Sequence, residues 1–290
     1  MSATTRSMTE PTIDTFVDYR VVKRRNLWPW ILAAVTLIAT LGFVQAMATN
    51  ENLDWTVVGK YLFSPLILEG VWVTIQLSLA AMVVAIVLGL AIGLARMSAN
   101  RVLSGLASVY TTIFRGVPML VQLILWGNIG LIFQNLSIGI PFTDFIFFSV
   151  PTNAIITPFT AAIIGLALAE AAYIAEIVRA GILSVDRGQI EASHSLGMTP
   201  GHTTRRIVLP QALRLIIPPT GNEFVSLIKA TSLVAVIAGG DLLTQAQNLA
   251  ATSYRVIEMM AVATFWYIVI VTVASIGQHY LERSFSKGHH

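Results

Sequence analysis

Long stretches without charged residues limit what this chain can fold into more than any other feature. Four stretches, 26–50, 70–95, 116–143 and 259–281, contain no Asp, Glu, Lys or Arg. Each reaches the ~20 largely apolar residues that a helix needs to cross a bilayer. Charged residues make up 11% of the chain, against about 25% in soluble domains, and the mean hydropathy is +0.74. The chain is therefore predicted to be an all-α integral membrane protein.

Two more apolar stretches are interrupted by ionisable residues. One spans about 159–178 and contains Glu170 and Glu176, and the other spans about 216–238 and contains Glu223 and Lys229. With the four uninterrupted stretches, they predict six transmembrane helices.

The distribution of basic residues predicts the orientation of these helices. If the N-terminus is cytoplasmic, the outside segments hold only Lys60 and Arg255, while fourteen of the 18 Lys and Arg residues face inside. The positive-inside rule then places both termini in the cytoplasm. We expect residues 1–27 and 283–290 to be cytoplasmic tails, with no signal peptide, and residues 28–48 to form the first helix. The fourteen inside residues are Arg6, Arg20, Lys23, Arg24, Arg25, Arg96, Arg101, Arg179, Arg187, Arg205, Arg206, Arg214, Arg283 and Lys287.

Composition also excludes several classes of function. The chain has no cysteine, so disulfides and thiolate sites are excluded. The basic pI of about 9.3 fits cytoplasmic loops that face anionic membrane lipid, and the interleaved basic and aromatic residues of a nucleic-acid surface are absent. The histidines form no metal-ligand pattern, and His289 and His290 are native or belong to a tag. No metal site and no nucleic-acid partner are expected.

Apolar residues recur at three- and four-residue spacing between Arg101 and Arg115, which predicts an amphipathic helix along the cytoplasmic surface. Gly116 and Pro118 then favour a turn before a second helix that runs to about Phe133. The alternative is one long tilted helix over 103–133 with Arg115 buried.

The segment 134–158 combines three prolines with four phenylalanines. It is predicted to be a re-entrant or capping element on the outside. Its aromatic side chains either pack against the helices or form a docking surface for a partner.

A polar loop at 184–210 lies between two apolar spans. Asp186 is the expected N-cap of a short helix, Gly197 suits its left-handed end, and Pro200 begins a second short helix. Small residues at Ala192 and Ser193 would allow another backbone to approach. From these residues alone, two interpretations of the loop are equally good: a docking surface for a partner, or a solvated connector between the spans.

The spacing within this loop is specific. Glu191-Ala192-Ser193, three residues, Gly197, nine residues, then Ile207-x-Leu209-Pro210 resembles the signature loop of the membrane subunits of bacterial ABC importers, with Ser193 in place of the second alanine. The segments 114–123, 171–179, 209–214 and 229–233 resemble the branch of these permeases that takes up polar amino acids.

The resemblance implies a permease core over 66–282, made of five helices, with the helix at 28–48 as an addition. It implies a bacterial cytoplasmic (inner) membrane location, a second permease subunit that is identical or paralogous, and an extracytoplasmic amino-acid-binding protein. The chain has no Gly-x-x-x-x-Gly-Lys-Ser/Thr motif, so ATP and Mg are expected on a separate pair of ATPase subunits. The residues implied in ATPase coupling are Glu191, Ala192, Ser193, Gly197, Arg205, Ile207, Leu209 and Pro210.

Polar groups inside the spans mark the expected substrate path. A charge near the bilayer centre costs at least ~2.5–3.5 kcal/mol, so such groups face a cavity or a partner. Pro218 and Pro219 are expected to bend or break the later span, as in other carriers. The candidate residues are Arg115, Glu170, Tyr173, Glu176, Asn222, Glu223, Lys229, Thr231 and Ser232.

Glu170 is interpreted as the group that selects a cationic or amide side chain, because this position varies in the family. Pairing with Lys229 or Arg115 to hold helices together is the alternative for both glutamates, and it is favoured for Glu176. Ala230 departs from the acid or amide often found there in the family, so carrying over a substrate site to this helix is not secure.

Two other classes of protein remain open from the sequence. A self-sufficient secondary carrier would need its own ion-coupling site and no ATPase-docking loop. A membrane enzyme would need a convergent acid, base or metal set, and the chain shows no recognisable pattern of this kind.

Overall fold

The structure is a computed structural model that describes residues 26–51, 53–140 and 145–286. The chain divides into two units, residues 1–53 and residues 54–290. Each unit is described by itself. The tails predicted at 1–27 and 283–290 lie largely outside the described residues.

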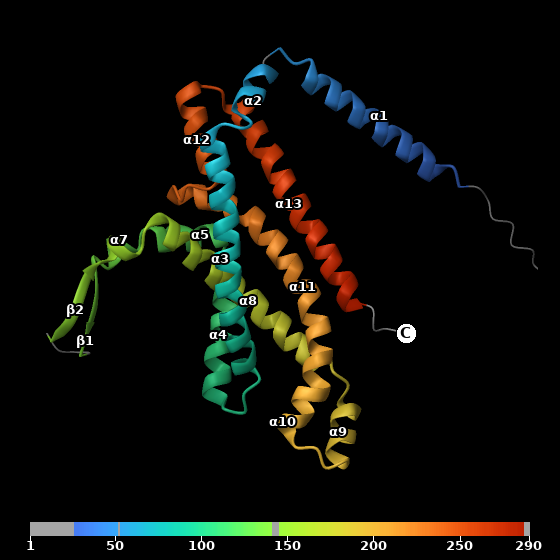
Figure 1. Cartoon of the computed structure of the whole chain (residues 1–290), viewed down its shortest axis with the longest axis vertical. Helices are drawn as coiled ribbons and strands as arrows, with labels where there is room; N and C mark the ends of the chain where they lie inside the picture. The colour runs from blue at the N-terminus through green and yellow to red at the C-terminus, as the bar shows by residue number, and fades with distance from the viewer. Residues whose placement is uncertain (1–25, 52, 141–144, 287–290) are drawn as a thin grey trace, which may run out of the picture. The chain divides into compact units, whose positions relative to one another are not determined.

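The described residues are mostly helical (Figure 1). The first unit contains α1, and all other elements belong to the second unit. The elements are α1 (Trp28–Ala48), α2 (Trp55–Tyr61), α3 (Pro65–Arg96), α4 (Arg101–Gly116), α5 (Met119–Gly127), α6 (Ile129–Ile132), β1 (Asn135–Gly139), β2 (Ile146–Pro151), α7 (Thr152–Ile155), α8 (Pro158–Leu183), α9 (Arg187–Ser195), α10 (Pro200–Thr203), the π-helical turn η1 (Thr204–Val208), α11 (Leu209–Ala230), the 3₁₀ helix η2 (Thr231–Ile237), α12 (Leu242–Ser253) and α13 (Val256–Ser286).

Four single helices, α1, α3, α8 and α13, are long and apolar enough to cross a membrane. Two bent pairs also qualify when each pair is taken together. One pair joins α4 to α5 with a bend of 99°, and the other joins the α10–η2 segment to α12 with a bend of 45°. The number of predicted spans equals the upper count of six, in which each bent pair is one span, although the prediction placed residues 101–115 on the membrane surface and not in a span. The side chains of α1, including Trp28 and Trp30, are exposed, as expected for a helix whose surroundings are lipid.

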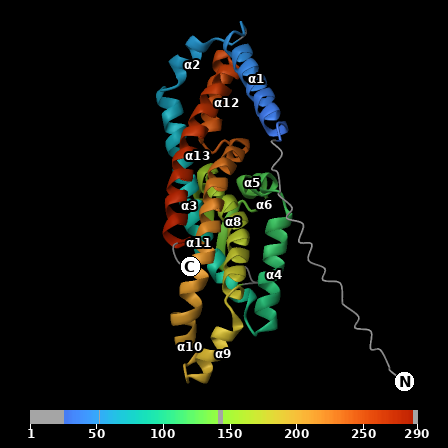
Figure 2. The same cartoon turned by 90° about the vertical axis from the view of Figure 1, so that its right-hand side faces the viewer.

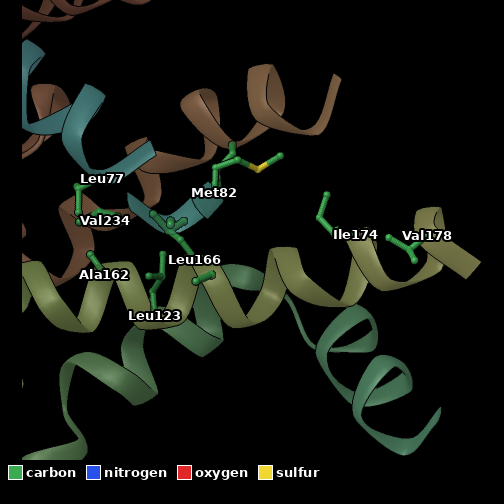
Figure 3. Packing of buried hydrophobic residues seen from close by; sticks show 11 residues of the cluster. Leu77, Met82, Leu123, Ala162, Leu166, Ile174, Val178 and Val234 are labelled. Atoms are coloured by element: carbon green, nitrogen blue, oxygen red, sulfur yellow. The ribbon is translucent and has the colours of Figure 1, made fainter. Parts of the chain in front are cut away.

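The closest helix packing joins α3 to α8 through small residues. Ala81, Ala85, Gly89 and Gly93 recur every four residues on α3, and all are buried. Small residues at this spacing let two membrane helices approach closely. Larger side chains join this contact in one buried apolar cluster, which includes Leu77 and Met82 of α3 and Leu166 and Ile174 of α8 (Figure 3). The pair of helices is thus the packing centre of the second unit.

Gly93 is the most testable residue of this contact. A Cβ atom at position 93 would lie 2.8 Å from the Ala175 carbonyl oxygen and 3.1 Å from the Val178 Cβ atom. We expect Gly93→Val to destabilise the fold by about 1–3 kcal/mol through overpacking, measured as a lower thermal midpoint in detergent. Gly105→Val is the matched control, because a Cβ there meets no atom within 4 Å among the described residues. Equal midpoints for the two variants would contradict this packing.

The bend between α4 and α5 confirms the turn predicted at Gly116–Pro118, and the alternative of one long helix is wrong. Gln122 holds the bend from the inside. It is 5% exposed, and its Nε2 donates to the carbonyl oxygens of Phe114 and Val117, both at 2.9 Å. Phe114 lies in the last turn of α4 and Val117 is its C-cap, where helical partners run out.

Of the bend or break expected at Pro218–Pro219, the break is not found, because α11 continues through both prolines to Ala230. Each proline removes one backbone donor without necessarily ending a helix. The chain breaks later, where Ala238 and Gly240 adopt φ values of 52° and 82°. Asp241 then caps α12 by accepting from the Leu243 backbone N–H at 3.0 Å.

The segment 134–158 contains an antiparallel hairpin, which an all-α prediction does not include. Strands β1 and β2 pair between Asn135 and Pro151, and Figure 1 shows them extending from α7. Several phenylalanines here, including Phe145 and Phe147, are more than half exposed. Within the described residues, the alternative in which these aromatic side chains pack against the helices is therefore not supported.

Candidate functional site

The polar loop lies at one end of the second unit. Figures 1 and 2 show α9 and α10 at the end opposite α2 and the connection between α12 and α13. The two ends therefore meet opposite sides of a membrane that α3 and α8 cross. With the predicted orientation, the end with α9 is the cytoplasmic one.

The local structure of the loop is as predicted from its capping residues. The Asp186 Oδ1 atom accepts from the Gly188 backbone N–H at 2.6 Å and so caps α9. Gly197 has φ of 77°, which is strained for any residue with a Cβ atom, and its N–H donates to the His194 carbonyl at 2.9 Å. Pro200 begins α10.

The loop is fixed to the spans rather than free. Val185 and Val208 of the loop are buried together with Ala212 of α11. The Gln211 Nε2 atom of α11 donates to Gln189 Oε1 of α9 at 2.6 Å. Helix α10 continues without a break through η1 into α11. Single π-helical turns of this kind often occur at functional sites.

Most residues implied in ATPase coupling are on the surface of this loop. Glu191, Ala192, Gly197, Arg205, Leu209 and Pro210 are exposed, and Ile207 is half-buried. Ser193 is different, because it is 2% exposed and its Oγ atom lies 2.9 Å from the Thr203 Oγ1 atom, so its side chain is not on this surface. Sequence reasoning missed Leu196, which is 82% exposed beside Gly197. An apolar residue inside a polar loop was the available signal.

The second cluster of polar residues lies inside the spans and centres on Glu176. Its Oε1 atom accepts from the Arg179 Nη2 and Nε atoms at 2.5 and 3.2 Å, and its Oε2 atom pairs with Arg96. The Arg115 Nη1 atom is 4.0 Å from Oε2. Glu176 therefore joins α3, α4 and α8 through opposite charges, which matches the interpretation favoured for this residue. Sequence reasoning missed Arg96, which is 80 residues away in the chain.

Glu170 lies two turns earlier on α8 and is 3% exposed. Its Oε1 atom has no hydrogen-bond partner among the described residues. The carboxylate of Glu223 on α11 would repel that of Glu170 when both groups are ionised. A buried carboxyl without a partner is unfavourable, so this group is placed to bind a donor or a cation.

Arg115 connects the two glutamate positions. Its guanidinium carbon lies 5.4 Å from the centre of the Tyr173 ring, within the range of a cation–π contact. It also interacts electrostatically with Glu223. We call Arg115, Glu170, Tyr173, Glu176 and Glu223 the membrane polar cluster. It draws on α4, α8 and α11.

The other candidates for the substrate path make contacts elsewhere in the described structure. Asn222 is exposed and accepts from the Gln278 Nε2 atom of α13 at 2.5 Å. Thr231 and Ser232 donate to the carbonyls of Ile228 and Lys229, at 2.6 and 2.8 Å. Lys229 itself is exposed at the end of α11. The hydrogen bonds of the described residues do not join these four to Glu170.

The fold and the two polar regions define the membrane subunit of a transporter that takes its energy from another chain. The chain belongs to the family of binding-protein-dependent transport system inner membrane components, whose model matches residues 83–287. It is therefore a multi-pass inner-membrane permease subunit and not an enzyme, and the reading as a self-sufficient secondary carrier is not favoured.

Individual relatives agree with this assignment. The chain is 42% identical over 260 residues to the arginine transport system permease protein ArgU of Corynebacterium glutamicum, covering 89% of this chain and 80% of that one. It is 33% identical over 235 residues to the glutamine transport system permease protein GlnP of Escherichia coli, covering 80% and 97%. The crystal structure of an amino acid ABC transporter with histidines superposes with a TM-score of 0.68 at 35% identity, covering 80% and 99%.

Proposed function

We propose that this permease subunit imports amino acids with a cationic or amide side chain, and that a cationic side chain is preferred. The observation that carries this proposal is the Glu170 carboxyl, which is buried inside a span with an unpartnered Oε1 atom. A cationic side chain would supply both the donor and the opposite charge that this group lacks.

The names of three matched proteins mention amino acids of these classes. ArgU is named for arginine, and the structure with a TM-score of 0.68 was solved with histidines. GlnP is named for glutamine, whose amide can donate to a carboxylate.

The membrane polar cluster also offers a place for the backbone groups of an amino acid. A free amino acid carries a carboxylate and an ammonium besides its side chain. Arg115 is 44% exposed at its side chain and is available to a carboxylate, while Glu223 is half-buried and is available to the ammonium. Asn222, Lys229, Thr231 and Ser232 would lie further along the path.

Energy for import would come from outside this chain. Two permease subunits, identical or paralogous, would work with two ATPase subunits that bind ATP and Mg, and an extracytoplasmic binding protein would deliver the amino acid. The exposed residues of α9 and its turn, Glu191 to Gly197, would sit in a groove of each ATPase. Closure of the ATPases around ATP would bring the two loops together and open the path outward, and hydrolysis would reverse this change.

The proposal is tested by uptake into proteoliposomes that contain the whole complex, with ATP inside and the binding protein outside. We expect ATP-dependent uptake of labelled arginine, with unlabelled arginine, lysine and histidine competing best, glutamine next and glutamate least. The same order is expected for equilibrium binding to the purified complex without the binding protein, which removes the specificity of that protein from the result. Equal competition by glutamate, or uptake that continues without the ATPase, would overturn the proposal.

A further inference from the structure

Two hydroxyl groups are buried between the short helices of the polar loop. Ser193 is the one buried residue of α9 and Thr203 the one buried residue of α10, and both are 2% exposed. Their Oγ and Oγ1 atoms are 2.9 Å apart. The contact that buries side chains between these two helices is therefore a hydrogen bond and not an apolar one.

The direction of this hydrogen bond follows from the protons available. The Ser193 hydroxyl donates its single proton to the Ile190 carbonyl at 2.7 Å. The Thr203 hydroxyl must then donate to Ser193 Oγ. The result is a chain of two hydrogen bonds that runs from α10 through Ser193 to the backbone of α9.

Two further contacts support the position of α9: Gln189 accepts from Gln211 of α11, and Ile190 packs against the cluster of Val185, Val208 and Ala212. Both α9 and α10 are short. They contain nine and four residues, which is too short for stable isolated helices. The turn between them is closed by the backbone N–H of Met198, which donates to the Ser193 carbonyl at 3.0 Å. Ser193 therefore holds the turn through both its backbone and its side chain, while Thr203 directly precedes the continuous η1–α11 helix.

We propose that Ser193 and Thr203 are positioning residues that lock α9 to α10, so that movement of the exposed loop is transmitted to α11 and not lost in the turn. The inference rests on the proposed docking of α9 to the ATPase. An alanine at position 193, as in the family signature, would have no side-chain oxygen to accept from Thr203.

The test compares Ser193→Ala and Thr203→Val, singly and together, with Thr204→Val as the matched control. Thr204 is the next residue after Thr203 but is exposed, and its Oγ1 donates to the Pro200 carbonyl at 2.9 Å. The first readout is the number of amino acids imported per ATP hydrolysed by the whole complex in proteoliposomes. The second is amide hydrogen exchange of residues 187–208 in the same complex without nucleotide.

We expect each single variant to lower the import ratio about 3- to 10-fold and to speed exchange by a similar factor, because a buried hydroxyl bond is lost. The double variant should be no worse than Ser193→Ala, since both single variants remove the same hydrogen bond between Thr203 and Ser193. Thr203→Ser keeps the hydroxyl and should restore the wild-type values.

Several outcomes would overturn the lock. These are an unchanged ratio and unchanged exchange in both single variants, strictly additive effects in the double variant, and an equal loss in Thr204→Val. A wild-type complex without ATP-driven import would overturn the proposed function instead, and hydrogen exchange would still decide whether the two helices are locked.

Discussion

Replacing Glu170 with glutamine is expected to reduce the uptake of arginine about 10- to 100-fold. The variant keeps the shape of the side chain but removes the charge that would pair with the substrate, and hydrogen bonds to charged groups contribute about 1.5–3 kcal/mol. The measurement is kcat/KM for ATP-dependent arginine uptake in proteoliposomes. Because the Oε1 atom lacks a partner among the described residues, the free energy of unfolding should stay equal or rise.

Glutamine uptake by the same variant provides the internal control. An amide substrate loses less than a cationic one when the carboxylate becomes an amide, so the preference for arginine over glutamine should fall. If the relative uptake of arginine, glutamine and glutamate stays the same, Glu170 has no part in selection and specificity belongs to the binding protein. A large loss of stability would point to an ion-pairing role of Glu170 between helices.

The second large effect is expected at Glu191. Glu191→Lys reverses a charge on the exposed face of α9, and disrupting a desolvated, hydrogen-bonded charge pair at an interface costs about 2–5 kcal/mol. We expect import to fall at least ~30-fold, while membrane insertion and amino-acid binding to the complex remain. The rates of ATP hydrolysis and of import are both measured on the same proteoliposomes. In this variant the two rates should no longer be proportional to each other.

Glu282→Lys provides the matched charge reversal outside the loop. Glu282 lies on α13, where it accepts from the Gln278 Nε2 atom at 2.8 Å. Import by this variant should stay within a few-fold of the wild type. Normal import by Glu191→Lys would show that α9 does not dock through this carboxylate.

The sequence predicts the parts of this structure that depend on local chemistry. The turn at Gly116–Pro118, the Asp186 cap and the left-handed Gly197 depend on backbone preferences of single residues, and all three are found. The spans follow from the length of apolar stretches. In each case the cause and the effect lie within a few positions of each other.

The features that were missed depend on residues far apart in the chain. Arg96 is the partner of Glu176, and Gln278 is the partner of Asn222, and such pairs are decided by how helices pack. The inward side chain of Ser193 likewise depends on where Thr203 is placed. The hairpin at 134–158 was missed because its prolines and aromatic residues fit several structures equally well.

The small residues between α3 and α8 also limit which parts of the subunit can move. A Cβ atom on Gly89 would lie 2.6 Å from the Ile174 Cβ atom, and one on Gly93 would lie 2.8 Å from the Ala175 carbonyl. Backbones this close have no room to slide past each other, so we expect α3 and α8 to behave as one rigid strut. The transport path would then open to one side of the membrane or the other by bending outside the α3–α8 pair. The expected hinges are Gly116–Pro118 before α5 and Ala238–Gly240 before α12.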